Sequence, residues 1–366
     1  MMMIDRRLLI HFDWGLLALV LLIASVGIVN LYSISSSEAT GTAFYMKQLS
    51  WLLIGLLAMI VVAFVEYRYY SDFAYLIHGV TVFLLVVVMV FGMITSGAQR
   101  WIRIGSLSFQ PSEFVKVSLI IVLAKYFEKP PDRKGLALKD LLIPSLFLMI
   151  PMGLILKQPD LGTAIVLLLI LSSIVLFVKI RWSSLLVIGL IGASTLPLLW
   201  GFLKEYQKKR IYTFFDPGLD PLGSGYHIIQ SKVAVGSGGV FGKGFMKGTQ
   251  CKLGFLPEQQ TDFIFSVLAE EWGLLGSLLV ISLYLILILW GLRIAMTAKD
   301  RFGAILAFGV VAMLFWHAFI NIGMVVGIMP VVGIPLPLLS YGGSFMVSTL
   351  IGVGLLLNVS MRRYLF

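Results

Sequence analysis

Phe255-Leu-Pro-Glu-Gln-Gln-Thr-Asp-Phe-Ile-Phe-Ser-Val-Leu-Ala-Glu-Glu-Trp-Gly273 is the stretch at which the character of this chain changes. It ends the only long hydrophilic segment and leads directly into a long apolar run. Two carboxylates, Glu258 and Asp262, stand four residues apart at this change. Because they are ionisable groups at the mouth of an apolar run, they are the first candidates for chemistry.

The composition indicates a membrane protein. Of the 366 residues, 59% are hydrophobic and only 13% are charged, and the mean hydropathy is +0.98. A soluble domain contains about 25% charged residues. Repeated apolar runs of roughly 18 or more residues can each cross a hydrocarbon core of about 30 Å as a helix. They are too long and continuous for outer-membrane strands, which alternate over about ten residues. The expected fold class is therefore an all-α polytopic membrane protein.

Ten spans are expected within one integral-membrane domain that covers residues 1–366. The expected ranges are 14–33, 49–65, 74–95, 113–127, 141–157, 161–179, 183–201, 263–291, 303–326 and 340–360. Residues 202–262 form one large loop between spans seven and eight. The fifth and sixth spans are separated because Pro159 stops a helix and Asp160 can cap the next one.

The distribution of Lys and Arg predicts the orientation. The short loops on one side, together with both termini, hold most of these residues, whereas the other short loops hold only Lys47, Arg100, Arg103 and Lys157. Cytoplasmic loops carry the excess of positive charge, so both termini are expected in the cytoplasm. The first apolar run, from Trp14 to Leu31, exceeds the 7–15 residues of a signal-peptide core, and we expect it to remain uncleaved.

The large loop at 202–262 then lies outside, and it is basic as well. The net charge of +10 for the whole chain does not require a nucleic acid, because orienting charges account for much of it. Two interpretations of the basic loop remain open on charge alone. It is either an ordinary solvated loop or a surface for an anionic partner such as a phosphate-bearing lipid.

Neither a resident metal nor a nucleotide is indicated by the motifs. The single cysteine, Cys251, and four scattered histidines show no metal-ligand spacing. The glycine-rich stretch 235–248 lacks the spacing of a P-loop, and Lys243 is followed by Gly244 rather than Ser or Thr. We expect this stretch to be a tight outer loop whose backbone amides could face a lipid phosphate.

Glu258 and Asp262 would share one face of a helix that began at Pro257. One interpretation is that they merely complement the helix dipole. The other is that Asp262, kept ionised near the helix N-terminus, is a general base. The residues alone leave both open.

A second polar group is expected at the outer start of the fourth span. Glu113 and Lys116 lie three residues apart in a position where ionisable groups are costly and are usually paired or functional. Upstream, Trp101 is either an interfacial anchor or part of a site. Arg100 and Arg103 could hold a pyrophosphate bidentately.

A serine hydrolase is not favoured. Ser340 and Ser344 flank a glycine pair at the entry to the last span, but His317 is expected in the middle of the ninth span with no evident route to them. A serine nucleophile requires a base and an orienting group. Close packing of small residues is the better explanation of this segment.

Taken in order, seven segments of the chain resemble the SEDS family (shape, elongation, division and sporulation), and within it the rod-shape branch. The likeness runs from the first span to the last. The segments are Gly97-Ala-Gln-Arg-Trp101, Phe109-Gln-Pro-Ser-Glu113 with Lys116, Gln158-Pro-Asp-Leu-Gly162, Gly236-Ser-Gly-Gly239, Phe255-Leu-Pro-Glu258, Thr261-Asp-Phe-Ile-Phe265 and Pro335-Leu-Pro-Leu-Leu-Ser-Tyr-Gly-Gly343. Two departures are visible, Gln260 in place of a frequent His and Cys251 in place of a frequent Ser.

The resemblance implies a ten-span peptidoglycan glycosyltransferase of the cytoplasmic (inner) membrane that polymerises lipid II on the outer face. It implies a class B penicillin-binding protein as the crosslinking partner, together with other elongation-complex proteins. The family's essential aspartate falls on Asp262, its membrane-mouth pair on Glu113 and Lys116, and its loop tryptophan on Trp101.

In the implied reaction, Asp262 takes the proton of the acceptor 4-hydroxyl and undecaprenyl pyrophosphate leaves. Basic groups would stabilise the charge of the pyrophosphate, and the candidates are Arg100, Arg103, Arg210, Lys232 and Lys243. A divalent cation, Mg²⁺ or Mn²⁺, could share this role, and the sequence does not decide between metal and basic side chains. The role of Glu258, in chemistry or only at the helix start, also remains open.

Two other classes of function fit the sequence less well. A flippase for lipid-linked cell-wall precursors should place ionisable groups along a path at the membrane midplane. This chain concentrates them at the outer mouth and loop, which favours chemistry at one surface. A scaffold that only binds the penicillin-binding protein would leave the outer carboxylates without a role.

Overall fold

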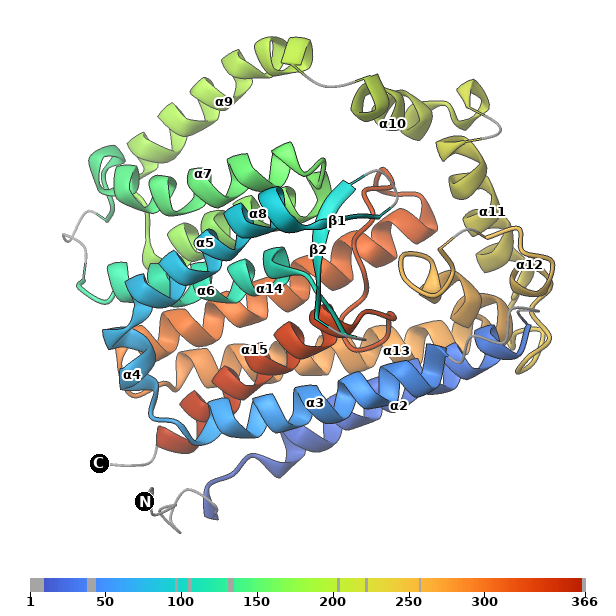
Figure 1. Cartoon of the computed structure of the whole chain (residues 1–366), viewed down its shortest axis with the longest axis horizontal. Helices are drawn as coiled ribbons and strands as arrows, with labels where there is room; N and C mark the ends of the chain where they lie inside the picture. Colours follow the sequence, from blue (N-terminus) through green and yellow to red (C-terminus); the bar gives the residue numbers. More distant parts are fainter. Residues whose placement is uncertain are drawn as a thin grey trace.

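The computed structural model describes residues 10–37, 44–95, 98–104, 107–130, 135–202, 205–220, 223–256 and 258–363, and most of these residues are helical. Ten long helices form a bundle (Figure 1). They are α2 (Trp14–Ser37), α3 (Phe44–Phe64), α5 (Ala74–Phe91), α6 (Pro111–Tyr126), α7 (Leu142–Lys157), α8 (Leu161–Val178), α9 (Trp182–Phe202), α13 (Ile264–Met296), α14 (Arg301–Val326) and α15 (Gly343–Arg362).

Each of these helices coincides with one of the ten expected ranges, and the expected all-α class of a polytopic membrane protein is confirmed. Eight described helices are long and apolar enough to cross a membrane. The α6 helix has 16 residues and carries Glu113 and Lys116, and α9 contributes only a shorter apolar segment, Trp182–Thr195. The full count of ten spans therefore remains a prediction. The cap on α8 is confirmed, because the Asp160 side chain accepts a hydrogen bond from the Thr163 amide.

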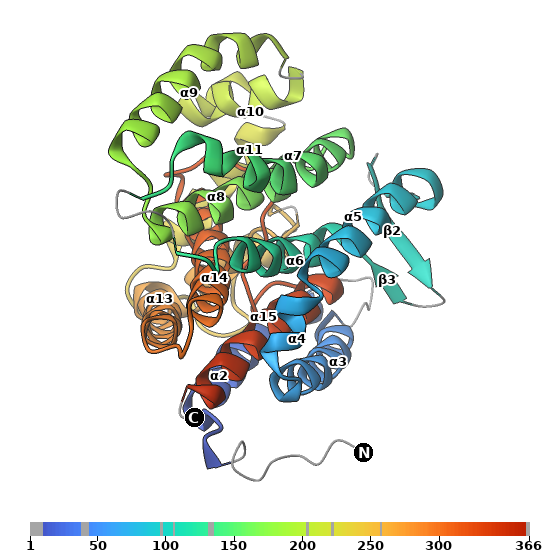
Figure 2. The same cartoon turned by 90° about the vertical axis from the view of Figure 1, so that its left-hand side faces the viewer.

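The core of the bundle lies around α14 and α15. Nearly every side chain of α15 is buried, and this helix packs along α3. The α14 helix contacts α13, α8 and α6. The peripheral helices instead expose apolar side chains such as Leu57 of α3 and Leu278 of α13. Apolar outward faces are expected where lipid rather than water surrounds a bundle. Helix α9 lies at the edge, away from this core (Figures 1 and 2).

A small antiparallel sheet supplements the helices, and the sequence reading did not predict it. Its strands are β1 (Met93–Thr95), β2 (Ala98–Ile104) and β3 (Leu107–Phe109), in the order β1-β2-β3. Trp101 of β2 pairs with Met93, and Arg103 pairs with Ser108. The sheet connects α5 to α6 and therefore lies at the end of the bundle where α6 begins.

The large loop is itself folded. It contains α10 (Glu205–Phe215), the short 3-10 turn η2 (Pro217–Leu219), α11 (Ser224–Ser237) and α12 (Thr249–Lys252). A second 3-10 turn, η1 (Leu138–Leu141), precedes α7, and a short helix, α4 (Tyr67–Asp72), connects α3 to α5.

The glycine-rich part of the loop is tight, as expected, but its amides serve the protein itself. The backbone amides of Lys243 and Gly244 donate to the carbonyls of Glu270 and Glu271. A Cβ at Gly242 would lie 2.1 Å from the carbonyl oxygen of Glu271, so only glycine permits this approach. These two amides are therefore not available to a lipid phosphate. For the other amides of the stretch the expectation stays a prediction.

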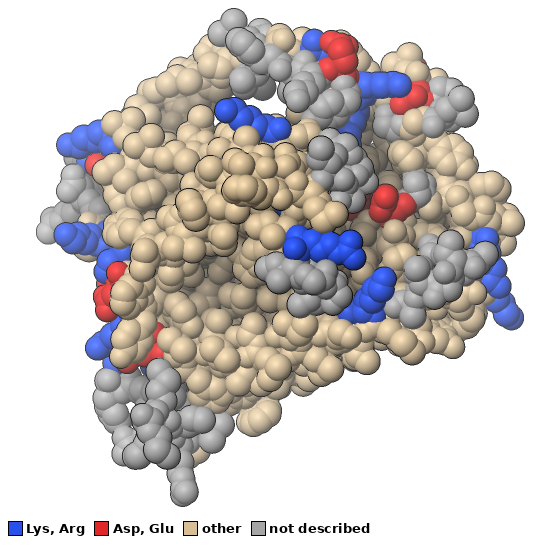
Figure 3. Space-filling view, in the orientation of Figure 1, with Lys and Arg blue, Asp and Glu red and all other residues tan. Residues whose placement is uncertain are grey.

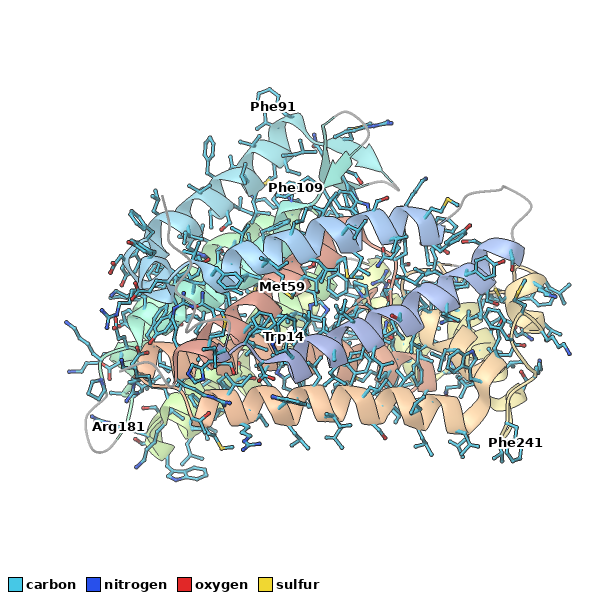
Figure 4. The ribbon with its side chains drawn as sticks, turned by 90° about the horizontal axis from the view of Figure 1, so that it is seen from below. Trp14, Met59, Phe91, Phe109, Arg181 and Phe241 are labelled. Carbon is cyan, nitrogen blue, oxygen red and sulfur yellow. The ribbon has the colours of Figure 1, made fainter. Side chains whose placement is uncertain are left out.

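The two ends of the bundle differ. Asp13, just before α2, accepts hydrogen bonds from Trp290 Nε1 at 3.0 Å and from Ser360 Oγ at 3.3 Å, so the beginning of α2 and the end of α15 lie together. Arg181 lies at this end and Phe241 at the opposite one (Figure 4). Charged side chains gather at the left edge and over the right half of the face in Figure 3, on either side of a largely uncharged zone.

Candidate active site

A cavity of about 440 Å³ opens at the end of the bundle that carries the sheet and α10. Strand β2, the start of α6, the turn before α8, α10, the turn before α13 and the segment before α15 all contribute to its wall. The face in Figure 3 is hollowed on its right side, with basic and acidic side chains around the hollow. Predicted site residues on the wall are Arg100, Trp101, Glu113, Arg210, Glu258 and Asp262.

Asp262 is held in a turn rather than in a helix. The amides of Thr261 and Asp262 both donate to the carbonyl of Glu258, whose φ is +47°, and α13 begins only at Ile264. The expected helix starting at Pro257 is therefore not formed over residues 258–262, and Pro257 itself lies outside the described residues. The left-handed conformation of Glu258 redirects the chain so that Glu258 and Asp262 both face the cavity.

The environment of Asp262 keeps its carboxyl poised for proton transfer. Its pKa is raised to about 7, chiefly by burial and also by the negative charge of Glu258, while the positive charge of Arg210 acts in the opposite direction. The expectation that Asp262 stays ionised near a helix N-terminus is thus wrong, because burial is the largest influence on the pKa of this carboxyl and raises it. A general base is most effective when its pKa is close to the working pH.

Glu113 and Lys116 form the predicted ion pair beside the cavity. Lys116 Nζ lies 2.8 Å from Glu113 Oε2, and both side chains are nearly inaccessible, at 1% and 6% exposure. Lys116 also lies 3.0 Å from His317 Nε2 and 5.1 Å from the centre of the Phe345 ring. Glu113 lines the cavity. The interpretations of a structural pair and of a functional pair are therefore not exclusive.

The two arginines of β2 have different surroundings. The guanidinium of Arg100 donates to the carbonyls of Gln158, at 2.8 Å, and Pro159, at 2.5 Å, and lies 3.9 Å from Asp160. It joins the sheet to the turn before α8 while lining the cavity. Arg103 is exposed and is not among the residues described on the cavity wall. The structure thus does not bring the two together as a bidentate pyrophosphate clamp.

The predicted basic residues of the large loop also separate. Arg210 of α10 lines the cavity. Lys232 of α11 is exposed and packs over Gly327 at the end of α14. Lys243 bonds Glu270 Oε1 and Thr249 Oγ1, each at 2.7 Å, and so fastens the glycine-rich loop to α13. Neither lysine belongs to the described cavity wall.

Several wall residues were not predicted as part of the site. Trp51 of α3 lies against Gly343, where an added Cβ would come within 2.1 Å of the indole. Asp160 lines the cavity in addition to capping α8. The glycine pair Gly342-Gly343 at the start of α15 could have indicated this contact, because a glycine allows a large ring to approach the backbone. Trp51 itself lies inside an apolar run, so the sequence does not distinguish it from an ordinary core residue.

The serines near α15 are occupied in the structure. Ser340 Oγ donates to the carbonyl of Thr261, and Ser344 Oγ accepts from the amide of Gln110. His317 does reach this region, with its ring 5.0 Å from that of Phe345, which corrects the expectation that it has no route there. Its Nε2 lies against Lys116 Nζ rather than against a serine hydroxyl, so a serine triad is not formed here.

Three carboxylates, Asp160, Glu258 and Asp262, line the same cavity. Within the ranges that the structure describes, no three His, Cys, Asp or Glu side chains come close enough to hold a metal ion. The described carboxylates therefore do not form a ready-made metal site.

Comparison with known proteins identifies a family model and relatives that match nearly the whole chain. The family model FTSW_RODA_SPOVE, described as a cell cycle protein, matches residues 12–365. The chain is 41% identical to the peptidoglycan glycosyltransferase MrdB of Escherichia coli (strain K12), covering 97% of this chain and 95% of that protein. It is 34% identical to the peptidoglycan glycosyltransferase RodA of Treponema pallidum (strain Nichols), covering 96% of this chain and 98% of that one.

Two solved structures share the fold. One describes the structural coordination of polymerization and crosslinking by a peptidoglycan synthase complex, with a TM-score of 0.82 and 36% identity over 97% of this chain and 99% of that one. The other is the rod shape determining protein RodA of Thermus thermophilus, with a TM-score of 0.73 and 33% identity over 97% of this chain and 98% of that one.

Proposed function

The chain belongs to the FtsW/RodA/SpoVE family, the SEDS family, and from this premise we propose that it is a peptidoglycan glycosyltransferase that polymerises lipid II during cell elongation. The observation that carries the proposal is the cavity in which Asp262, with a pKa raised to about 7, faces the same space as Arg210 and Glu113. One wall supplies a proton acceptor and another supplies positive charge, as glycosyl transfer from a pyrophosphate donor requires.

In the proposed reaction, the 4-hydroxyl oxygen of the acceptor sugar forms a bond to the anomeric carbon of the donor. The bond from that carbon to the pyrophosphate oxygen breaks, and undecaprenyl pyrophosphate leaves with the bonding electrons. Asp262 takes the hydroxyl proton, a contribution typically of 10²–10⁴-fold. Arg210 stabilises the growing negative charge of the leaving group, because a positive group fixed in advance requires no reorganisation during the reaction.

Arg100 and Glu258 act beside these two groups. Arg100 is held by backbone carbonyls, so its charge is fixed at the cavity wall rather than mobile. Glu258 raises the pKa of Asp262 and thereby strengthens it as a base. Trp101 and Glu113 complete the substrate-binding wall, and Lys116 acts from behind it through its ion pair with Glu113. Lys232 and Arg103, which are exposed and lie outside the described cavity wall, would act on the path of the lipid-linked substrate before it reaches the cavity, whereas Lys243 holds the glycine-rich loop to Glu270.

We place the cavity on the outer face of the cytoplasmic membrane, with both termini in the cytoplasm. The charge distribution in the short loops supports this orientation, and the beginning of α2 lies beside the end of α15, at the end of the bundle away from the cavity. Crosslinking by a class B penicillin-binding protein would use the strands as they form. A related structure describes polymerization and crosslinking within one peptidoglycan synthase complex, which supports such a partner.

A lipid-linked-precursor flippase is the alternative. It needs polar groups along a path with access from both sides. Between the cavity and the opposite end, the described part of α15 buries almost all of its side chains, and α14 is similarly enclosed. Concentration of the ionisable groups at one end favours chemistry at one surface.

The proposal is tested with purified lipid II, the wild-type chain and Asp262→Asn, each with and without the crosslinking partner. Wild type is expected to produce glycan strands and the variant essentially none, while the variant still folds and binds the partner. Equal polymer from both would remove Asp262 from the reaction. Transfer of lipid II across vesicle membranes by the wild type, without any polymer, would replace the transferase by the flippase.

A further inference from the structure

Two buried polar side chains on α14, His317 and Asn321, stand outside the cavity wall but contact the groups that form it. They lie four residues apart, on the same face of the helix, about 5–6 Å from each other. Their exposed fractions are 3% and 0%. Buried polar groups in an otherwise apolar helix are costly unless their hydrogen bonds are made. The groups to which His317 and Asn321 are hydrogen-bonded therefore indicate the role of these two residues.

Asn321 holds the chain at Asp262. Its Nδ2 donates to the carbonyl of Asp262 at 2.9 Å and to that of Ile334 at 2.7 Å. Both partners are acceptors, so the amide nitrogen must face them. The same amide thus joins the turn that carries the proposed base to the segment behind it. In that segment, a Cβ at Gly333 would lie 3.3 Å from Asp262 Oδ2.

His317 contacts the ion pair of Lys116 and Glu113. Its Nε2 lies 3.0 Å from Lys116 Nζ, and its Nδ1 lies 3.4 Å from the carbonyl of Pro335. An ammonium group can only donate, so Nε2 must accept and cannot carry a proton. The proton of the neutral ring is then on Nδ1, facing the Pro335 carbonyl. Lys116 in turn donates to Glu113 Oε2, the carboxylate on the cavity wall.

We propose that His317 and Asn321 are positioning residues that fix the separation of Glu113 and Asp262 across the cavity. His317 and Asn321 lie on successive turns of α14, and both contact the same neighbouring segment, at Pro335 and Ile334 respectively. The proposal rests on the proposed function, since it assigns these residues to the same reaction. A shift of about 1 Å in a reacting group can cost roughly 10²-fold in rate, so anchors that touch no substrate can still govern turnover.

The test compares Asn321→Leu and His317→Leu with a matched control, Asn358→Leu. Asn358 is also fully buried and donates through Nδ2 to two backbone carbonyls, those of Val62, at 2.6 Å, and Val65, but at the opposite end of the bundle. All three changes remove a buried polar anchor, so all three are expected to lower thermal stability. Only the two α14 changes are expected to lower kcat per folded molecule, by roughly 10- to 100-fold, with KM for lipid II altered less than about threefold.

Two further readouts separate positioning from folding. His317→Gln, which keeps an acceptor for Lys116, is expected to recover most of the kcat lost in His317→Leu. If His317 acts through Lys116 and Glu113, the loss from His317→Leu should nearly vanish in a Glu113→Gln background, since coupled residues are not additive. Asn321→Leu should keep its full effect in that background.

The outcomes are distinct. A wild type that polymerises lipid II, with both α14 variants at wild-type kcat per folded molecule, would overturn the positioning role and leave the proposed function intact. Equal loss of kcat in Asn358→Leu would also overturn it, because the effect would then be structural. A wild type that makes no polymer would overturn the proposed function itself, and this inference with it.

Discussion

Helix α6 carries an acid–base pair at each end, with the same spacing of three residues. At the cavity end, Lys116 Nζ and Glu113 Oε2 lie 2.8 Å apart with exposures of 1% and 6%. At the other end, Lys125 Nζ and Glu128 Oε2, the latter just past the helix, lie 3.0 Å apart with exposures of 29% and 44%. Similar geometry therefore occurs in two very different environments.

The pockets at these two ends repeat the contrast. The second pocket, of about 290 Å³, is lined by residues including Tyr67, Lys125 and Asp300. There Asp300 accepts from Tyr67 and from the Gly303 amide, and Lys125 donates to Ser71 and Glu128. In the first cavity, Asp262 faces open space with a raised pKa. The comparison shows that a charged side chain alone does not make a reactive site. The carboxylate must also be shielded from water and must line a cavity that can admit a substrate.

The largest expected effect contrasts two aspartates. Asp262→Asn should reduce polymerisation by about 10²–10⁴-fold, the usual contribution of a general base. Asp300→Asn should leave the rate per folded molecule within about twofold of wild type and cost less than about 1 kcal/mol, since Asn also caps helices well. A comparable loss of activity in Asp262→Asn and Asp300→Asn would show that the cavity end is not the only end of the bundle that governs the reaction.

Asp262→Asn also has a signature that needs no substrate. The pKa of Asp262 is raised from 3.8 to about 7 in the folded chain, so its protonated form is favoured there. Its contribution to stability is then lost as pH rises from about 4 to about 7. Thermal unfolding should show the variant to be more stable than wild type at pH 8, with the difference shrinking toward pH 5.

The ion pairs provide the second contrast. Lys116→Met leaves the buried Glu113 without its partner and should cost about 3–5 kcal/mol of unfolding free energy. Lys125→Met breaks an exposed pair and should cost about 0–1 kcal/mol. Unfolding of both variants in the same detergent measures the two costs. A loss below about 1 kcal/mol for Lys116→Met would mean that water reaches the pair and that the two ends are electrostatically alike.

A smaller effect is expected from two glycines with positive φ. Gly333, at +75°, would place a Cβ 3.3 Å from Asp262 Oδ2, whereas Gly239, at +56°, has nothing within 4 Å. Alanine at either position should cost about 1–2 kcal/mol in backbone strain. Only Gly333→Ala should also lower kcat, by roughly tenfold, because it displaces the carboxylate. Unchanged kcat in that variant would show that Asp262 is not tightly positioned by the segment behind it.

The sequence predicted the fold and part of the site for a clear physical reason. Ionisable residues that interrupt apolar runs, such as Asp262, Glu113 and Lys116, stand out because their burial is costly. Helix positions could be read for the same reason, since apolar runs are long and their breaks are sharp. Asp160 was found as a helix cap, although its place on the cavity wall required the three-dimensional structure.

The remaining parts depend on packing over long sequence distances. Lys232 and Lys243 carry the same positive charge as Arg210, but of these three residues the described cavity wall includes only Arg210, because of how the large loop folds into α10, α11 and α12. His317 and Asn321 lie in a helix whose sequence gives little sign of which side chains meet them. The sheet at 93–109 was missed because its strands are short and their pairing partners were not evident.

The central claim is that Asp262 removes the proton and that Glu258 helps to set its pKa. The most direct test is the pH dependence of kcat/KM for lipid II polymerisation in wild type and in Glu258→Gln. The account predicts that the wild-type rate rises with pH around a midpoint near the pKa of about 7. It also predicts that the midpoint moves to lower pH in the variant, because a neighbouring negative charge has been removed. A rate independent of pH between about 5.5 and 8.5, or the same midpoint in both proteins, would contradict it.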